Sequence, residues 1–215
     1  MKEHMLHINI LKFLKIPIIC LILLTSCSTT MVNKSVKYNE YKVLEEILSF
    51  DTSFDNLNSL LYVDIDMQNM YLLKKGTILR AFKISSSYYG TGSEVNSFKT
   101  PLGKHEIYKK IGEDLPINAI LKGRVWNGAI ANVITDDIDT DFDHVTSRIL
   151  WLDGLEEGKN NGPGVDSRSR YIYIHGTAEE GLIGKPASDG CIRMYNSEVI
   201  ELFGLVEEKT QVWIN

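Results

Sequence analysis

The feature that most restricts the fold is a change of periodicity at residue 60, where apolar and polar side chains begin to alternate. This alternation runs to residue 67, and a second run of the same kind follows from Met70 to Leu73. Lys75-Gly76 then provides a turn before a third run over residues 78–84. A period of two indicates strands with one buried face, and a glycine-containing pair between such runs indicates a tight turn. The segment therefore predicts a meander of antiparallel strands.

The rest of the chain continues this pattern. Turn signals occur at Thr100-Pro101-Leu102-Gly103 and at Asn161-Gly162-Pro163-Gly164. Strand-like runs occupy Glu106–Lys109, Ile149–Leu152, Tyr171–His175 and Gln211–Ile214. A late helix is predicted from about Ser197 to Phe203, with Asn196 or Ser197 as its N-cap and Gly204 at its end. We therefore predict a mostly β fold, an antiparallel β-sandwich or barrel with one or two short α-helices.

The first residues indicate export. Three lysines precede an apolar run from Ile16 to Leu24, which ends at Thr25-Ser26-Cys27. This arrangement is typical of a secretory signal peptide. The run is shorter than the roughly 20 residues that a membrane-spanning helix needs, so a transmembrane anchor or a buried core helix is the weaker interpretation.

Leu24-Thr25-Ser26-Cys27 also resembles the processing signal of bacterial lipoproteins, in which the cysteine is diacylated and becomes the new amino terminus. The resemblance implies a signal peptide over residues 1–26, lipidation of Cys27 and an exported protein anchored to a membrane facing the periplasm. By the same resemblance, Ser28 after the lipidated cysteine favours sorting of the protein to the outer membrane. Polar residues 27–38 suit a tether, and apolar residues at helical spacing predict a short helical lead-in over 39–59. Residues 60–215 then form one domain.

The cysteines and the net charge restrict which chemistry and which partners this chain can have. Cys20 leaves with the signal peptide and Cys27 carries lipid, so Cys191 is the one remaining thiol and no internal disulfide is expected. An unpaired cysteine in an exported protein is either a packed small side chain or a reactive group. The net charge of −5, without a basic cluster, argues against nucleic acid as a partner.

The surroundings of Cys191 favour a reactive group. His175 ends an apolar strand and is followed by Gly176, while Cys191 is preceded by Gly190. A histidine at the rim of a sheet can take the proton of a nearby thiol and lower its pKa below about 8.5. The glycines allow backbone amides to point at a developing oxyanion. Residue types and spacing alone leave the more common alternative open, a structural histidine and a packed cysteine.

The segments around these residues resemble the signature of the L,D-transpeptidase catalytic domain, the YkuD-like family. The signature segments are His175-Gly176-Thr177, Ile183-Gly184-Lys185-Pro186 and Ser188-Asp189-Gly190-Cys191-Ile192-Arg193. Matching residues elsewhere, in the same order, are Val63-Asp64, Gln68, Tyr71, Thr100-Pro101-Leu102-Gly103, Leu152-Asp153-Gly154 and Asn160 to Asp166. The resemblance covers roughly Leu60 to Asn215, so residues 60–215 are identified as a member of this family of catalytic domains.

The resemblance implies a cofactor-independent enzyme acting on peptidoglycan stem peptides. Cys191 would attack the carbonyl after the L-centre of a diamino acid in a tetrapeptide stem, and terminal D-alanine would leave. The thioester would then pass its acyl group to an amine. The resemblance maps the base onto His175, the carbonyl that orients its ring onto Gly176, and the oxyanion-hole amides onto Gly190 and Cys191.

The same resemblance predicts that Ser188, Asp189 and Arg193 line the substrate site. The planar guanidinium of Arg193 suits a substrate carboxylate, and an internal salt bridge that stiffens the loop is the alternative. Asp189 replaces a second histidine that many relatives carry. A carboxylate at this position opposes thiolate formation, so Asp189 is expected to point away, to pair with Arg193 or to tune acceptor choice.

Several alternatives remain open. Water as acceptor would make the same site an L,D-carboxypeptidase or a peptidoglycan-protein amidase, and a decayed site would leave an inactive wall-binding lipoprotein. No metal site is expected, because His105 and His144 are interpreted as surface or loop residues and Asp136–Asp143 lacks a calcium-loop pattern. The expected partners are peptidoglycan stem peptides and, through the lipid, a membrane; the protein is expected to be a monomer.

Overall fold

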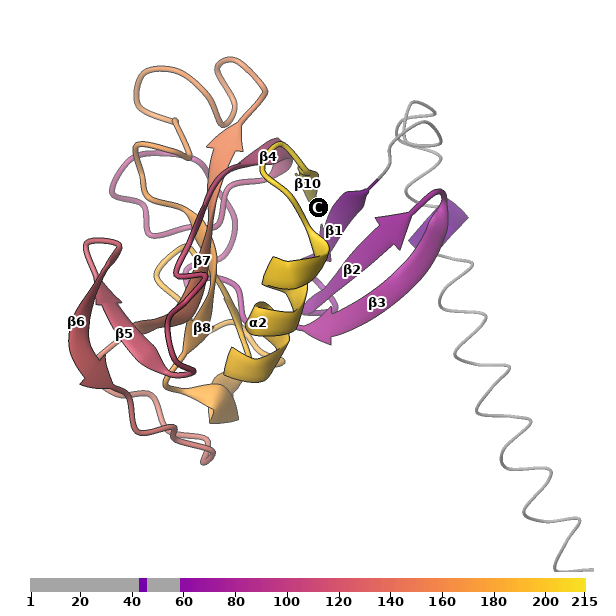
Figure 1. Cartoon of the computed structure of the whole chain (residues 1–215). Coiled ribbons are helices and arrows are strands. Elements are labelled where there is room, and N and C mark those ends of the chain that lie inside the picture. The colour runs from indigo at the N-terminus through magenta and orange to yellow at the C-terminus, as the bar shows by residue number, and fades with distance from the viewer. Residues whose placement is uncertain (1–42, 46–58) are drawn as a thin grey trace, which may run out of the picture. The chain divides into compact units, whose positions relative to one another are not determined.

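A computed structural model describes residues 43–45 and 59–215 (Figure 1). Residues 43–45 are helical and fall within the predicted lead-in 39–59. The rest of that lead-in, apart from residue 59, and the predicted signal peptide and tether lie outside the described residues, as do Cys20 and Cys27. Within the described ranges, no helix has the length and apolar character needed to cross a membrane.

Residues 59–215 fold around one ten-stranded mixed sheet. The strands run in the order β3-β2-β1-β10-β4-β7-β5-β6, and β8 pairs with β7 and β9. The strands are β1 (Leu60–Asp64), β2 (Asn69–Lys74), β3 (Thr77–Lys83), β4 (Gly103–Ile111), β5 (Ala119–Lys122), β6 (Val125–Ile130), β7 (Val145–Gly154), β8 (Tyr173–Thr177), β9 (Ile192–Met194) and β10 (Gln211–Ile214). A 3₁₀ turn, η2 (Glu180–Leu182), and the helix α2 (Asn196–Leu205) complete the fold. The predicted mostly β fold with short helices is confirmed.

The predicted meander forms β1, β2 and β3, which pair in antiparallel order. Lys75 and Gly76 both have positive φ, 49° and 71°, as a two-residue hairpin turn requires. Two other pairs of strands are parallel rather than antiparallel. β10 inserts between β1 and β4, parallel to β1, and β9 lies parallel to β8.

The core lies between the sheet and α2. Figure 1 shows α2 in front of β7 and β8, and the inward residues Val199, Leu202 and Phe203 of α2 belong to the same buried cluster as Leu150 and Ile174 of these strands. Burial of apolar side chains on this scale is the main stabilising term of such a domain.

The predicted capping of α2 is wrong at both ends. The N-cap is Tyr195, without a side-chain cap. The carboxylate of Glu180 instead accepts the N–H of Asn196 at 2.8 Å, which places a negative charge at the positive end of the helix. Gly204 lies inside the last turn, and the helix ends at Leu205.

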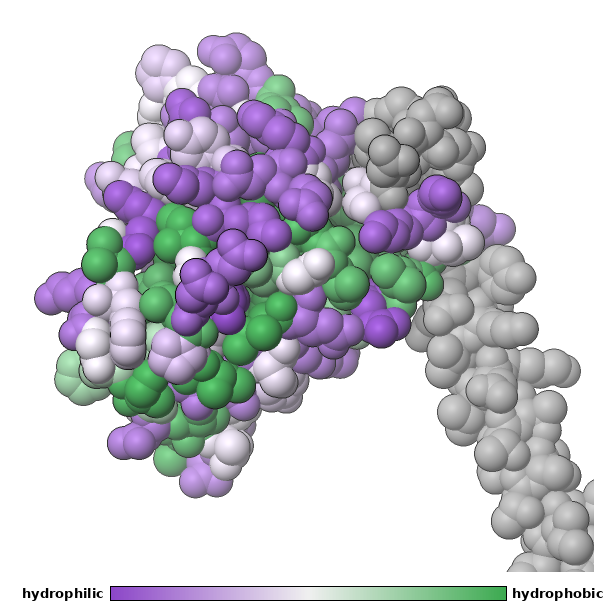
Figure 2. Space-filling view, viewed as in Figure 1, coloured by the Kyte–Doolittle hydropathy of each residue, from purple (hydrophilic) through white to green (hydrophobic). Residues whose placement is uncertain are grey.

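A hairpin of β5 and β6 occupies a segment in which the sequence pattern predicts no strand. Its tip is Gly123-Arg124, both with positive φ, and every residue of β6 is exposed. Figure 2 shows apolar surface at the lower left, where Figure 1 places this hairpin and the chain that follows it. The exposed apolar side chains of this part of the chain are Ile117, Val125, Trp126, Ile130, Ile138 and Phe142.

Candidate active site

The parallel pairing of β8 with β9 brings His175 and Cys191 onto the same face of the sheet. His175 is the register partner of Arg193. Side chains alternate along a strand, so Cys191, two residues before Arg193, projects from the same face as His175 and Tyr173. Ile174 and Ile192 project from the opposite face into the core. Two residues far apart in sequence thus become diagonal neighbours on adjacent strands.

His175 is buried inside β8, with 1% of its surface exposed, rather than standing at the rim of the sheet. Its Nδ1 lies 2.7 Å from the carbonyl oxygen of Gly176, the contact that the sequence predicted. A carbonyl can only accept, so the proton resides on Nδ1 and Nε2 is left as the basic nitrogen. Burial lowers the pKa of His175, which Asp143 and the Gly176 contact raise and Arg193 lowers further. The imidazole is therefore held neutral, as a general base must be.

Asn196, which we expected only as a helix cap, supports this strand end. Its amide donates to the carbonyl of Thr177 at 2.7 Å, and its Oδ1 accepts the hydroxyls of Thr146 and Ser147, each at 2.6 Å. A Cβ on Gly176 would lie 2.6 Å from the Asn196 Oδ1, so glycine is required there. The sequence signal that could have identified this role is a short polar side chain at the start of an amphipathic helix.

The thiol of Cys191 contacts backbone groups on both sides. The N–H of Tyr173 donates to Sγ at 3.4 Å, and Sγ donates to the carbonyl of Tyr171 at the same distance. No hydrogen bond joins Sγ to His175 among the described residues. Burial raises the pKa of Cys191 to about 12; Asp143 adds to this effect, while the Tyr173 amide, Arg193 and Arg170 oppose it. The expectation that histidine lowers this pKa is therefore wrong for the resting protein, because desolvation outweighs the favourable contacts.

The two predicted oxyanion-hole amides differ in availability. Gly190 has a φ of +116°, and its N–H already donates to the Ser188 hydroxyl at 3.3 Å. The N–H of Cys191 has no hydrogen-bond partner within the described part of the chain. The Cys191 amide is therefore the one ready to stabilise a developing oxyanion.

Ser188 and Arg193 are placed differently from the prediction. Ser188 is fully buried, and its hydroxyl donates to the Cys191 carbonyl at 2.5 Å. It therefore stabilises the turn of residues 188–191, which we call the nucleophile turn. Arg193 is 2% exposed and forms ion pairs with Asp143 at 2.8 Å and Glu179 at 2.9 Å. Both terminal nitrogens are engaged, so the structure favours the internal salt bridge over a substrate contact.

Asp189 is exposed and forms no ion pair with Arg193 among the described residues. Burial, the carboxylate of Asp143 and that of Asp139 raise its pKa, while Arg193 lowers it. Asp189, Asp143 and Arg193 line a pocket of about 240 Å³, with Tyr88 and Tyr89 on another side. Of the predicted substrate residues, Asp189 alone is open to solvent.

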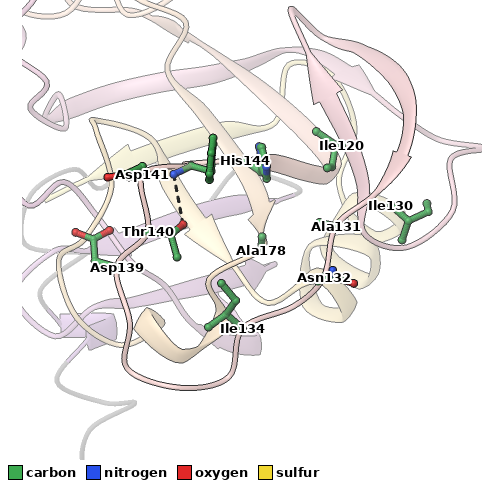
Figure 3. A pocket seen from close by; sticks show the side chains of 11 residues that line it. Ile120, Ile130, Ala131, Asn132, Ile134, Asp139, Thr140, Asp141, His144 and Ala178 are labelled. Carbon is green, nitrogen blue, oxygen red and sulfur yellow. Dashed lines mark hydrogen bonds between the residues drawn. The ribbon is translucent and has the colours of Figure 1, made fainter.

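A second pocket, of about 560 Å³, lies along the segment from residue 130 to residue 144. Figure 3 shows Asp139 at one end of it and the aliphatic side chains of Ile120 and Ile130 at the other. Asp139, Thr140 and Asp141 line both pockets. The Thr140 hydroxyl also donates to the carboxylate of Glu179 at 2.6 Å. Because Glu179 pairs with Arg193, this hydrogen bond connects residues 136–143 to the ion pairs of Arg193.

His105, interpreted from the sequence as a surface or loop residue, is fully buried in β4. Its ring nitrogens contact the Gly103 carbonyl at 3.0 Å and the Ser167 hydroxyl at 2.9 Å. This histidine is structural and joins β4 to the chain that precedes β8. His144 is partly exposed and stacks on Phe142, with 5.7 Å between the ring centroids.

These features fit a class of protein, the cysteine acyl-transfer enzymes, with a thiol and a buried neutral imidazole on the same face of a mixed β sheet. Comparison with known proteins agrees: residues 58–214 match the family model of the YkuD L,D-transpeptidase catalytic domain. The chain therefore belongs to the YkuD family of L,D-transpeptidase catalytic domains.

Two curated proteins and one solved structure illustrate what this chain is similar to. A Bacillus subtilis protein named L,D-transpeptidase YkuD is 55% identical over 50 residues, covering 23% of this chain and 30% of that protein. Another from the same organism, named L,D-transpeptidase YqjB, is 50% identical over 52 residues, 24% of this chain and 28% of its own. A solved L,D-transpeptidase from Mycobacterium smegmatis is 16% identical, with a TM-score of 0.45, covering 74% of this chain and 58% of that one. The matches thus span about a third or less of the two Bacillus proteins.

Proposed function

We propose that this chain is an L,D-transpeptidase that acts on peptidoglycan tetrapeptide stems through a thioester on Cys191. The observation that carries the proposal is the parallel register of β8 and β9, which places Cys191 diagonally beside His175. The Gly176 contact supports the role of His175, because it leaves Nε2 free of a proton. The match to the family supports the class of substrate.

The first half-reaction forms the thioester. Nε2 of His175 takes the proton of the Cys191 thiol as Sγ attacks the carbonyl after the L-centre of the diamino acid. The Cys191 N–H donates to the oxyanion. The tetrahedral intermediate collapses, the bond to D-alanine breaks, and His175 returns the proton to the departing amine. D-alanine leaves, and the acyl group remains on sulfur.

The second half-reaction reverses these roles. An amine of another stem, of a wall-linked protein or of a free D-amino acid attacks the thioester, and His175 accepts its proton. Sγ leaves as thiolate and is reprotonated by His175, so the enzyme is regenerated. Water as acceptor would give a carboxypeptidase from the same residues.

Product analysis tests this function. The protein and its Cys191→Ala variant are incubated with purified disaccharide tetrapeptide, with and without a free D-amino acid, and the products are followed by mass spectrometry. Cross-linked dimers or exchanged D-amino acids that vanish in the variant are expected. Tripeptide alone would favour the carboxypeptidase, and unchanged substrate would favour a wall-binding role.

We propose further that the protein is exported and anchored through a lipid on Cys27. The support is the sequence pattern, a basic start, an apolar run and Leu24-Thr25-Ser26-Cys27. Labelling cells with a radioactive or clickable fatty acid should mark the protein, and Cys27→Ala should remove the label and release the protein from the membrane fraction. Label that persists in this variant would overturn the assignment.

A further inference from the structure

The charges around Cys191 do not favour its thiolate if only the predicted site residues are considered. Arg193 is the obvious cation, but Asp143 and Glu179 both pair with it. Two carboxylates against one guanidinium leave this cluster with a net negative charge, which opposes a negative sulfur. His175 is buried, and the Tyr171 and Tyr173 groups that contact Sγ are neutral backbone. A further positive group near Sγ would therefore favour the thiolate.

Arg170 is a positive group of the right kind. Its half-buried guanidinium donates to the carbonyls of Lys99 at 2.7 Å and Gly92 at 3.3 Å and to the Ser97 hydroxyl at 3.4 Å. All three acceptors are neutral, and no carboxylate pairs with Arg170 among the described residues. The rigid fork of arginine suits several fixed acceptors at once. Its charge is therefore held in place without being neutralised.

Two indirect connections link Arg170 to Cys191. Along its own chain it precedes Tyr171, whose carbonyl accepts the Cys191 thiol. Across space, the Lys99 carbonyl that it binds lies 3.3 Å from where a Cβ on Gly190 would stand. The two groups also influence each other's titration. Burial lowers the pKa of Arg170 and the charge of Cys191 opposes that change, while Arg170 lowers the pKa of Cys191.

We propose that Arg170 is a positioning residue for this reaction, whose uncompensated charge stabilises the Cys191 thiolate and whose carbonyl contacts fix residues 92–99 against the nucleophile turn. The proposal rests on the proposed role of Cys191 as nucleophile. In the reaction, Arg170 transfers no proton, since guanidinium stays protonated; His175 moves the proton, and Arg170 lowers the energy of the charge that is left on sulfur.

Alkylation of Cys191 tests the proposal without a wall substrate. In the full chain carrying Cys20→Ser and Cys27→Ser, Cys191 is the single thiol. The thiolate displaces iodide from iodoacetamide and forms a sulfur–carbon bond, so the rate reports the thiolate fraction at each pH. Arg170→Gln keeps an amide donor for the Lys99 carbonyl but removes the charge, and Arg170→Lys keeps the charge. Arg168→Gln is the matched control, because Arg168 lies in the same segment but pairs with Asp153 at 3.2 Å.

At every pH between about 7 and 10, Arg170→Gln should react about tenfold more slowly than the parent. Arg170→Lys should stay within about threefold, and Arg168→Gln should not change. Thermal unfolding and circular dichroism identify any variant that fails to fold, and the lysine variant then carries the test. Equal rates for the parent and Arg170→Gln, or equally slow glutamine and lysine variants, would overturn the proposal. An intact Arg170 effect in a protein that leaves the tetrapeptide unchanged would instead reject the proposed function alone.

Discussion

Cys191 and His175 are both held uncharged in the resting protein, and at the residue scale this determines how the site responds to pH. Burial raises the pKa of Cys191 to about 12 and lowers the pKa of His175 from its ordinary value. At any pH between the two pKa values, Cys191 is a neutral thiol and His175 is a neutral imidazole. This differs from cysteine enzymes that rest as a thiolate–imidazolium pair. Proton transfer to His175 must then accompany attack rather than precede it.

The rate of Cys191 alkylation should therefore rise about tenfold for each pH unit from neutral pH to about pH 10, without a plateau. The reason is that the thiolate fraction keeps increasing below a pKa of about 12. Iodoacetamide kinetics in the single-thiol background give this profile directly. A plateau that begins at or below neutral pH would show a preformed ion pair and contradict the neutral pair.

Asp189 offers a second test at this scale. Its carboxylate takes the position at which the family resemblance implies a second histidine, and it lies exposed near Asp143 and Asp139. Because His175 already has the basic nitrogen, Asp189→His should keep turnover of the tetrapeptide within about an order of magnitude. Steady-state rates measured by mass spectrometry check this, with Cys191→Ala as the inactive reference. Complete loss of turnover would reveal a role for the carboxylate that the geometry does not show.

The sequence identified the residues that we propose react, but not the side chains that surround them. Cys191, His175 and the Gly176 contact follow from a short local motif. The pairing of Arg193 does not, because Asp143 and Glu179 come from other segments and their side chains meet it only after folding. The burial of Ser188 does not follow from the motif either, because residues 85–100 cover it only after folding. The sequence therefore predicts a substrate contact for a side chain that is buried.

At the scale of elements, the sequence predicts the strands in which apolar and polar side chains alternate clearly. It does not predict the strands whose position depends on pairing with a neighbouring strand. β1, β2 and β3 appear where the period of two indicates them. β9 has only three residues and owes its position to β8, so its own sequence holds little signal. The β5–β6 hairpin turns on Gly123-Arg124 instead of the more typical Asn-Gly, and its outer strand lacks a buried face.

Arg124 attaches this hairpin to the aromatic residues beside Cys191. Its guanidinium lies 4.6 Å from the Trp151 ring centroid and 4.9 Å from that of Tyr171, and it donates to the Tyr173 hydroxyl at 3.1 Å. Arg124→Ala should lower the free energy of hairpin opening by about 0.5–1 kcal/mol, and Arg124→Lys should recover only part of it because lysine stacks less well. Hydrogen exchange of the β5 and β6 amides measures this opening. Unchanged exchange in the alanine variant would show that the hairpin docks without Arg124.

On the scale of the whole molecule, long-range pairings close the fold. The strand at residues 211–214 was predicted, but its place between β1 and β4 was not, because local periodicity carries no information about distant partners. His105 lies at the join between this part of the sheet and the segment that leads to Arg170 and Tyr171, through its contact with Ser167. A buried histidine at such a join couples stability to pH.

His105 should make the protein less stable as the pH falls from about 6.5 to about 4. Burial lowers its pKa from 6.5 to about 4, so in this window the unfolded chain binds a proton that the folded chain does not. The stability that neutral His105 provides is fully present above about 6.5 and is lost by about pH 4, a change of about 3 kcal/mol. His105→Gln keeps a donor for Ser167 and does not titrate, so the difference in unfolding free energy between parent and variant should shrink by this amount across the window. Urea unfolding at several pH values measures it, with the partly exposed His144→Gln as control; a parent and His105→Gln variant that lose stability in parallel would contradict the assignment.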